Sequence, residues 1–161
     1  MDFDKRLERA IERGSRTREE RSRAASEREL TEEELRNLYS KHRLDISEHI
    51  EDCLRRLADH YPGFRMQTVV GEEGWGARVS RDDLDFRAGR DSRSQYSRLE
   101  LLVTPFGPAH IIELLGKGTI RNKEVFNRRH YQLLAQVDAE SFQETIDLWV
   151  LEYAESYAAR S

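Results

Sequence analysis

A change of hydrophobic period at Pro62-Gly63 constrains the fold of this chain more than any other feature. Before this dipeptide apolar residues recur at helical spacing, and after it they alternate along the chain, beginning with Phe64 and Met66. Proline lacks an amide hydrogen and glycine accepts backbone conformations that end helices, so the pair predicts a boundary between a helix and a strand. The chain must therefore build both kinds of element around its core.

A long amphipathic helix is predicted before this boundary, from about residue 31 to residue 61. Thr31 and Glu34 form a capping box, which satisfies amide hydrogens in the first turn. Asp45 and Glu48 resemble a second cap, so a break near Leu44 stays open as an alternative. We expect the apolar stripe of this helix to supply an interaction surface, and its leading residues are Leu35, Leu38, Tyr39, Ile46 and Ile50.

Residues 64–134 follow the period of strands. Alternating apolar residues predict strands near 64–70, 75–79, 99–103, 109–115 and 124–134. The segments between them are turn and loop sequences, including a turn at 71–74, a polar loop at 88–95 and a break at 116–118, where Gly116 and Gly118 interrupt the pattern. Short connections favour antiparallel pairing of consecutive strands.

A second helix is predicted after Asp138, with Phe142, Trp149, Tyr153 and Tyr157 on one face. The predicted class is therefore α+β: an antiparallel meander of about five strands, flanked by the long helix near the N-terminus and by the C-terminal helix, packed on one face. We expect residues 30–161 to form one domain of this kind.

Residues 1–29 are expected to form a separate charged arm. Residues 1–30 hold nine basic and eight acidic side chains, and Phe3, Leu7, Ala10 and Ile11 form one short helical stripe. We expect Gly14 and Ser15 to interrupt that stripe. The following residues carry so little apolar surface that the arm is predicted to be either a short solvated helix or disordered.

Composition excludes several classes of protein. The chain of 161 residues has a net charge of −4, too balanced for a polybasic nucleic-acid-binding tail. Its start lacks a secretory h-region, and no apolar run reaches the length of a membrane span. The single cysteine, Cys53, allows no internal disulfide. We therefore expect a soluble cytoplasmic protein with no membrane partner.

The sequence lacks the common catalytic and metal-binding motifs, but one pair of residues has the spacing of metal ligands. No G-x-S-x-G, H-E-x-x-H or C-x-x-C sequence occurs. His49 and Cys53 stand at i and i+4 of the predicted helix, a spacing at which both side chains reach one metal ion. A complete site needs donors from elsewhere in the fold or from a paired helix. Because the sequence does not identify such donors, we expect no metal and no cofactor.

One face of the predicted sheet is rich in arginine. If Met66, Val79, Leu101 and Tyr131 point toward the helices, alternation places polar residues on the opposite face, among them Arg65, Arg78, Arg98, Arg128, His130 and Gln132. Arginine binds phosphate and carboxylate groups through two parallel hydrogen bonds, so these residues are candidates for binding an anionic ligand such as a phosphorylated metabolite, a nucleotide or RNA. The competing interpretation is a solvated face on which Arg and Glu pair across strands.

Two functions follow from these patterns. The first, which we favour, is a non-catalytic protein-interaction or dimerisation module whose partner is another protein or a second copy of the chain. The second is binding of an anionic ligand on the arginine-rich face. Nucleic acid is the less favoured ligand because no pair of exposed aromatic residues at strand spacing is predicted to stack bases.

Overall fold

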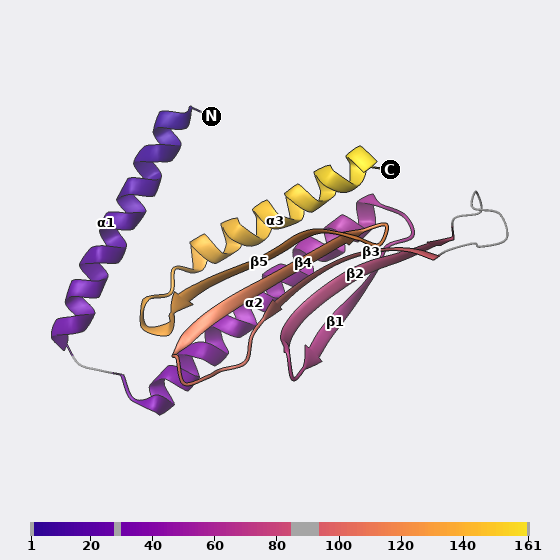
Figure 1. Ribbon diagram of the computed structural model, residues 1–161. Coiled ribbons are helices and arrows are strands. Elements are labelled where there is room, and N and C mark those ends of the chain that lie inside the picture. The colour runs from indigo at the N-terminus through magenta and orange to yellow at the C-terminus, as the bar shows by residue number, and fades with distance from the viewer. Residues whose placement is uncertain (1, 28–29, 85–93, 161) are drawn as a thin grey trace.

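The fold is a five-stranded antiparallel meander with helices before and after it (Figure 1), which confirms the predicted α+β class. The computed structural model describes residues 2–27, 30–84 and 94–160, and within these ranges it describes no side chains for 22–27, 83, 84 and 94. The elements are α1 (Phe3–Glu27), α2 (Glu32–His60), β1 (Arg65–Gly71), β2 (Gly74–Leu84), β3 (Ser94–Val103), β4 (Ile111–Ile120), β5 (Lys123–Leu133), η2 (Leu134–Gln136) and α3 (Ala139–Arg160). The predicted polar loop at 88–95 lies largely outside the described residues. Within the described part of the chain, no helix has both the length and the apolar character that crossing a bilayer requires.

Helix α2 begins and ends where its local sequence predicts. Thr31 is the N-cap, and its hydroxyl oxygen accepts a hydrogen bond of 3.1 Å from the backbone amide of Glu34. The helix ends at His60, and Gly63 then takes a φ of 101°, a left-handed conformation that favours glycine. The helix is continuous past Leu44, so the alternative of a break there is wrong.

The core lies between the sheet and the pair formed by α2 and α3. Both helices run in the same direction along the sheet (Figure 1), and both bury an apolar face against it. Fully buried residues come from both helices and from the central strands, among them Ile50, Leu54, Phe142, Ile146, Val79, Leu99, Leu101 and Leu114. The other face of the sheet is the one that carries Arg78 and Glu100.

Two glycines of β4 let α3 approach the sheet closely. A Cβ atom on Gly116 would lie 2.7 Å from the Trp149 ring, and one on Gly118 would lie 3.0 Å from the Tyr153 ring. The expected break at 116–118 is therefore wrong, because β4 continues to Ile120 and the glycines serve packing in place of a turn. A register irregularity between Gly118 and Thr119 adjusts the pairing of β4 with β5.

Helix α1 stands beside the body of the molecule (Figure 1). It runs unbroken through Gly14, where an interruption was expected. A single exposed glycine costs a helix only about 1 kcal/mol, and the arginines and glutamates around it favour helix. Among the side chains that the structure describes, Arg13 of α1 pairs with Glu144 of α3, and Arg21 Nε donates to Gln136 Oε1 over 2.9 Å, which ties α1 to the rest of the chain.

Candidate functional site

The arginine-rich face has fewer members than alternation predicts. Arg65, Arg78 and Arg98 lie on the sheet face opposite the helices, as expected, in strand pairs that also hold Ser80 and Glu100. These three arginines come from β1, β2 and β3, so this part of the predicted face is brought together by the meander.

The three candidates from β5 lie on the other face. Arg128, His130 and Gln132 pair in register with Gly116, Leu114 and Ile112, which all point toward the helices. Their contacts confirm this placement, because Arg128 pairs with Glu152, His130 packs against Phe142 with ring centres 5.0 Å apart, and Gln132 Oε1 accepts a 2.7 Å hydrogen bond from the amide of Asp138. The assignment of these residues to the open face was wrong.

The three residues of β5 were assigned to the wrong face because Tyr131, between them in the alternation, was taken as the apolar residue that points toward the helices. It was assigned to the core, yet it is 62% exposed on the open face. β5 is an edge strand whose helix-facing side is only partly covered by α3, so polar side chains are tolerated there and apolar alternation no longer reports which side is buried.

A buried carboxylate neutralises part of the remaining arginine face. Glu100 is 8% exposed and lies between Arg78 and Arg98, at 3.5 Å and 3.4 Å respectively. Arg78 also donates to Gln67 Oε1 over 3.3 Å. These guanidinium groups are therefore already engaged within the sheet, which favours cross-strand pairing over capture of an anion.

The apolar stripe of α2 faces its own sheet. Leu35, Tyr39, Ile46 and Ile50 are buried in the core of the same chain, and Leu38 is half-buried. The expectation that this stripe offers a surface to a partner was therefore wrong. A helix stripe of this kind covers a sheet in the same chain when the strands supply a matching apolar face.

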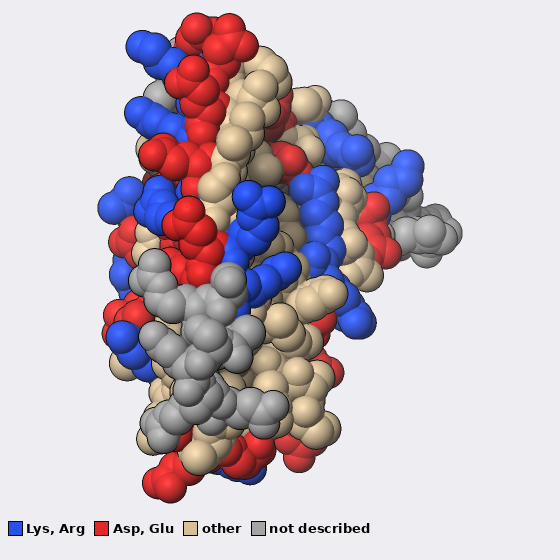
Figure 2. All heavy atoms as spheres, turned by 90° about the vertical axis from the view of Figure 1, so that its left-hand side faces the viewer, with Lys and Arg blue, Asp and Glu red and all other residues tan. Residues whose placement is uncertain are grey.

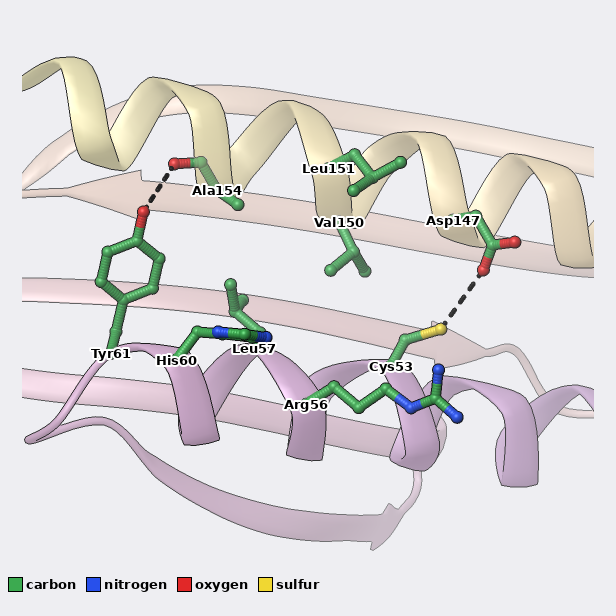
Figure 3. A pocket seen from close by; sticks show the side chains of 9 residues that line it. All are labelled: Cys53, Arg56, Leu57, His60, Tyr61, Asp147, Val150, Leu151 and Ala154. Carbon is green, nitrogen blue, oxygen red and sulfur yellow. Dashed lines mark hydrogen bonds between the residues drawn. The ribbon is translucent and has the colours of Figure 1, made fainter.

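A groove runs between α2 and α3 on the side of the helices away from the sheet (Figure 3). Its volume is about 640 Å³. Leu57, Val150 and Ala154 supply apolar walls, and Tyr61 lies at one end, where its hydroxyl donates to the carbonyl oxygen of Ala154 over 3.3 Å. The groove is thus an open apolar cleft between two helices.

Large apolar side chains are exposed on α3, at and next to the groove, and on α1. Leu151, which lines the groove, is 66% exposed and Leu148 is 54% exposed. On α1 the predicted stripe is also exposed, with Phe3 at 71%, Leu7 at 44% and Ile11 at 60%. Figure 2 shows α1 from outside, with uncharged side chains along one edge beside a charged flank. Among the described side chains, exposed apolar groups therefore occur on α1 and on the outer side of α3, as well as singly elsewhere on the surface.

Three metal-ligating side chains meet at the end of the groove opposite Tyr61. His49 Nε2 lies 2.8 Å from Asp147 Oδ1 and 3.5 Å from Cys53 Sγ, and Cys53 Sγ lies 3.3 Å from the same Asp147 oxygen (Figure 3 draws the last contact). Burial, reinforced by the hydrogen bond to Asp147, raises the pKa of the Cys53 thiol to about 12. Among the residues that the structure describes, His49, Cys53 and Asp147 form a group whose potential metal-ligand atoms all lie within 4.8 Å of one another.

Sequence reasoning identified His49 and Cys53 but missed Asp147. The signal available was the five acidic side chains of α3 between residues 139 and 161, which do not show which one faces α2.

Comparisons with protein-family models, with curated proteins and with solved structures find no match to this chain.

Proposed function

We propose that this chain is a non-catalytic interaction module that forms a homodimer, in which the N-terminal half of α1 from each copy lies in the groove between α2 and α3 of the other. The observation that carries this proposal is the exposed stripe of Phe3, Leu7 and Ile11. An amphipathic helix that leaves its apolar face in water gains free energy by placing that face in an apolar groove.

The charges of the two surfaces are complementary. The sequence of α1 holds eight basic and six acidic side chains, whereas that of α3 holds one basic and five acidic. The pair of Arg13 and Glu144 shows the same attraction within one chain. Opposite net charges favour the encounter of two copies and disfavour contact between two α3 surfaces.

The placement of α1 favours a partner in another copy. Its contacts through Arg13 and Arg21 hold it beside the start of α3, while the segment from Phe3 to Ile11 extends away from the body (Figure 1). In a symmetric dimer the contact between α1 and the groove is made twice, once by each copy. Each of the three apolar side chains contributes about 1.5–3 kcal/mol when fully buried, against an association cost of about 4–15 kcal/mol, so we expect a moderate affinity.

Sedimentation velocity of the full chain over about 1–200 µM, a range that brackets a micromolar dissociation constant, tests the proposal. We expect a concentration-dependent shift from monomer to dimer. Leu7→Glu, which places a carboxylate in the α1 stripe, and Leu151→Glu, which places one at the groove, should each leave the protein monomeric.

Leu44→Glu is the matched control. Leu44 is 50% exposed on α2 and does not line the groove, so this variant should dimerise as the unmodified chain does. Circular dichroism would establish that all three variants retain the fold. A chain that stays monomeric throughout the range, or a dimer that survives both Leu7→Glu and Leu151→Glu, would contradict the proposal.

A further inference from the structure

The side chains of His49, Cys53 and Asp147 form a compact triangle of donors that comes from two helices. α2 supplies the imidazole and the thiol one turn apart, and α3 supplies the carboxylate. His49 and Cys53 are half-buried and Asp147 is exposed, so the triangle lies where an ion can enter from solvent. Its three ligand atoms lie within 4.8 Å of one another.

We propose that His49, Cys53 and Asp147 bind a zinc ion, with the fourth ligand position open to solvent. Nitrogen, sulfur and oxygen ligands at zinc distances stand about 3.3–3.6 Å apart at the corners of a tetrahedron. Two edges of the observed triangle, 3.5 Å and 3.3 Å, already match this spacing. The third edge, 2.8 Å between Nε2 and Oδ1, is a hydrogen bond, and a shift of about half an ångström of the exposed carboxylate accommodates the ion.

The donor set selects zinc over the common hard cations. Magnesium and calcium prefer oxygen ligands, whereas a thiolate and an imidazole suit zinc. On binding, the thiol proton leaves to solvent and sulfur takes the metal, so the loaded site joins one dication to a thiolate, a carboxylate and a neutral imidazole. The charges then sum to zero, which removes the cost of an unbalanced charge at a half-buried position.

The same geometry disfavours a catalytic arrangement of cysteine, histidine and aspartate. In such a triad the imidazole contacts the nucleophile through one nitrogen and the carboxylate through the other. Here Sγ and Oδ1 both contact Nε2 of His49. The imidazole therefore cannot pass a proton between them, whereas a shared metal ion requires three ligand atoms grouped around one point, as these are.

Cobalt(II) is the probe because its spectrum reports the ligands directly. We expect the reduced, untagged full chain to bind one Co²⁺ with a sulfur-to-metal charge-transfer band and the intense visible bands of tetrahedral coordination, and to release it to one equivalent of Zn²⁺. Cys53→Ser should abolish the charge-transfer band. His49→Gln and Asp147→Asn should each weaken Zn²⁺ affinity by more than the roughly 10–100-fold typical of outer-shell changes.

His60→Gln is the matched control, because His60 lies on the same helix and lines the same groove without joining the triangle. It should keep the spectrum and the affinity. Circular dichroism of the metal-free variants separates loss of ligand from loss of fold. Absence of a Cys53-dependent band, or equal losses in His60→Gln and in His49→Gln, would overturn the proposal.

Metal binding does not rest on the proposed dimerisation. All three donors come from one chain, so the Leu7→Glu variant should bind Co²⁺ with the same spectrum as the unmodified chain. A monomer that binds metal would contradict only the self-association, and a dimer that shows no Cys53-dependent band would contradict only the metal site.

Discussion

Gly116 of β4 lies directly beneath the indole of Trp149, so close that a Cβ atom at this position would stand 2.7 Å from the ring. Trp149 is buried, and the ring of Phe126 also lies 3.1 Å from the same Cβ position. The close contact between β4 and α3 therefore depends on the missing side chain of Gly116.

Gly116→Ala should lower the free energy of unfolding by about 1–3 kcal/mol, the usual cost of overpacking a core. Urea denaturation followed by circular dichroism measures it. Gly71→Ala is the control, since Gly71 is also a strand glycine but its added Cβ would have no heavy atom within 4 Å. If the two variants are equally stable, α3 does not pack on Gly116 as described.

Tyr39→Phe should destabilise the fold at neutral pH and reduce its sensitivity to alkali. The buried hydroxyl donates to the carbonyl oxygen of Thr104 over 2.6 Å, and loss of this bond should cost about 0.5–1.5 kcal/mol. Burial raises the pKa of Tyr39 to about 12 from 10. The folded state therefore holds this proton more tightly, and its contribution is complete below pH 10 and is lost as pH rises from 10 toward 12. The alkaline loss of stability should be shallower in the variant, as measured by urea denaturation at several pH values.

His130 should make the fold sensitive to acid. Desolvation lowers its pKa below 6.5, and the side-chain amide of Gln132 lies 3.1 Å from its Nε2, where a neutral imidazole can accept a hydrogen bond and a protonated one cannot. Its stabilising contribution is complete above pH 6.5 and is lost as pH falls below that value toward the lowered pKa.

His130→Gln should therefore make the stability profile between about pH 7 and pH 5, the range around the unfolded-state pKa of histidine, flatter than that of the unmodified chain. Tyr39→Phe is its control, because that variant changes the alkaline limb and should leave the acid limb unchanged. An acid limb as steep in His130→Gln as in the unmodified chain would show that the proton is taken up elsewhere.

Glu100→Gln should destabilise the fold by about 1–3 kcal/mol, because it leaves Arg78 and Arg98 facing a neutral group at a nearly buried position. Both arginines are about a third exposed, so solvent screening keeps the loss below that of a fully buried pair. Glu124→Gln, an exposed glutamate of β5, should change stability by less than about 0.5 kcal/mol. Urea denaturation compares them, and equal stabilities would show that Glu100 is not held between the two arginines.

Several elements of the fold were predictable because their signals are local. The cap at Thr31 and the ending at Pro62-Gly63 involve residues within one turn of each other, and the structure confirms both. The hairpin of β1 and β2 likewise follows from the turn between Gly71 and Gly74. In contrast, Gly116 and Gly118 have the local signature of a turn, and only the aromatic rings of α3 explain why a strand continues through them.

The candidate sites likewise have parts that local sequence predicts and parts that depend on tertiary contacts. The sequence alone determined the class of the fold, the order of its elements after residue 30 and the spacing of His49 and Cys53 on one helix, because periodicity and capping act over a few residues. It did not determine that residues 3–27 form one long helix. Only the tertiary structure decided that Arg128, His130 and Gln132 face α3, and that Asp147, 94 residues beyond Cys53, completes a triangle of donors. Those contacts depend on how α3 is positioned against α2 and β5, which is set by packing of side chains distant in the chain and leaves no periodic signal in the sequence.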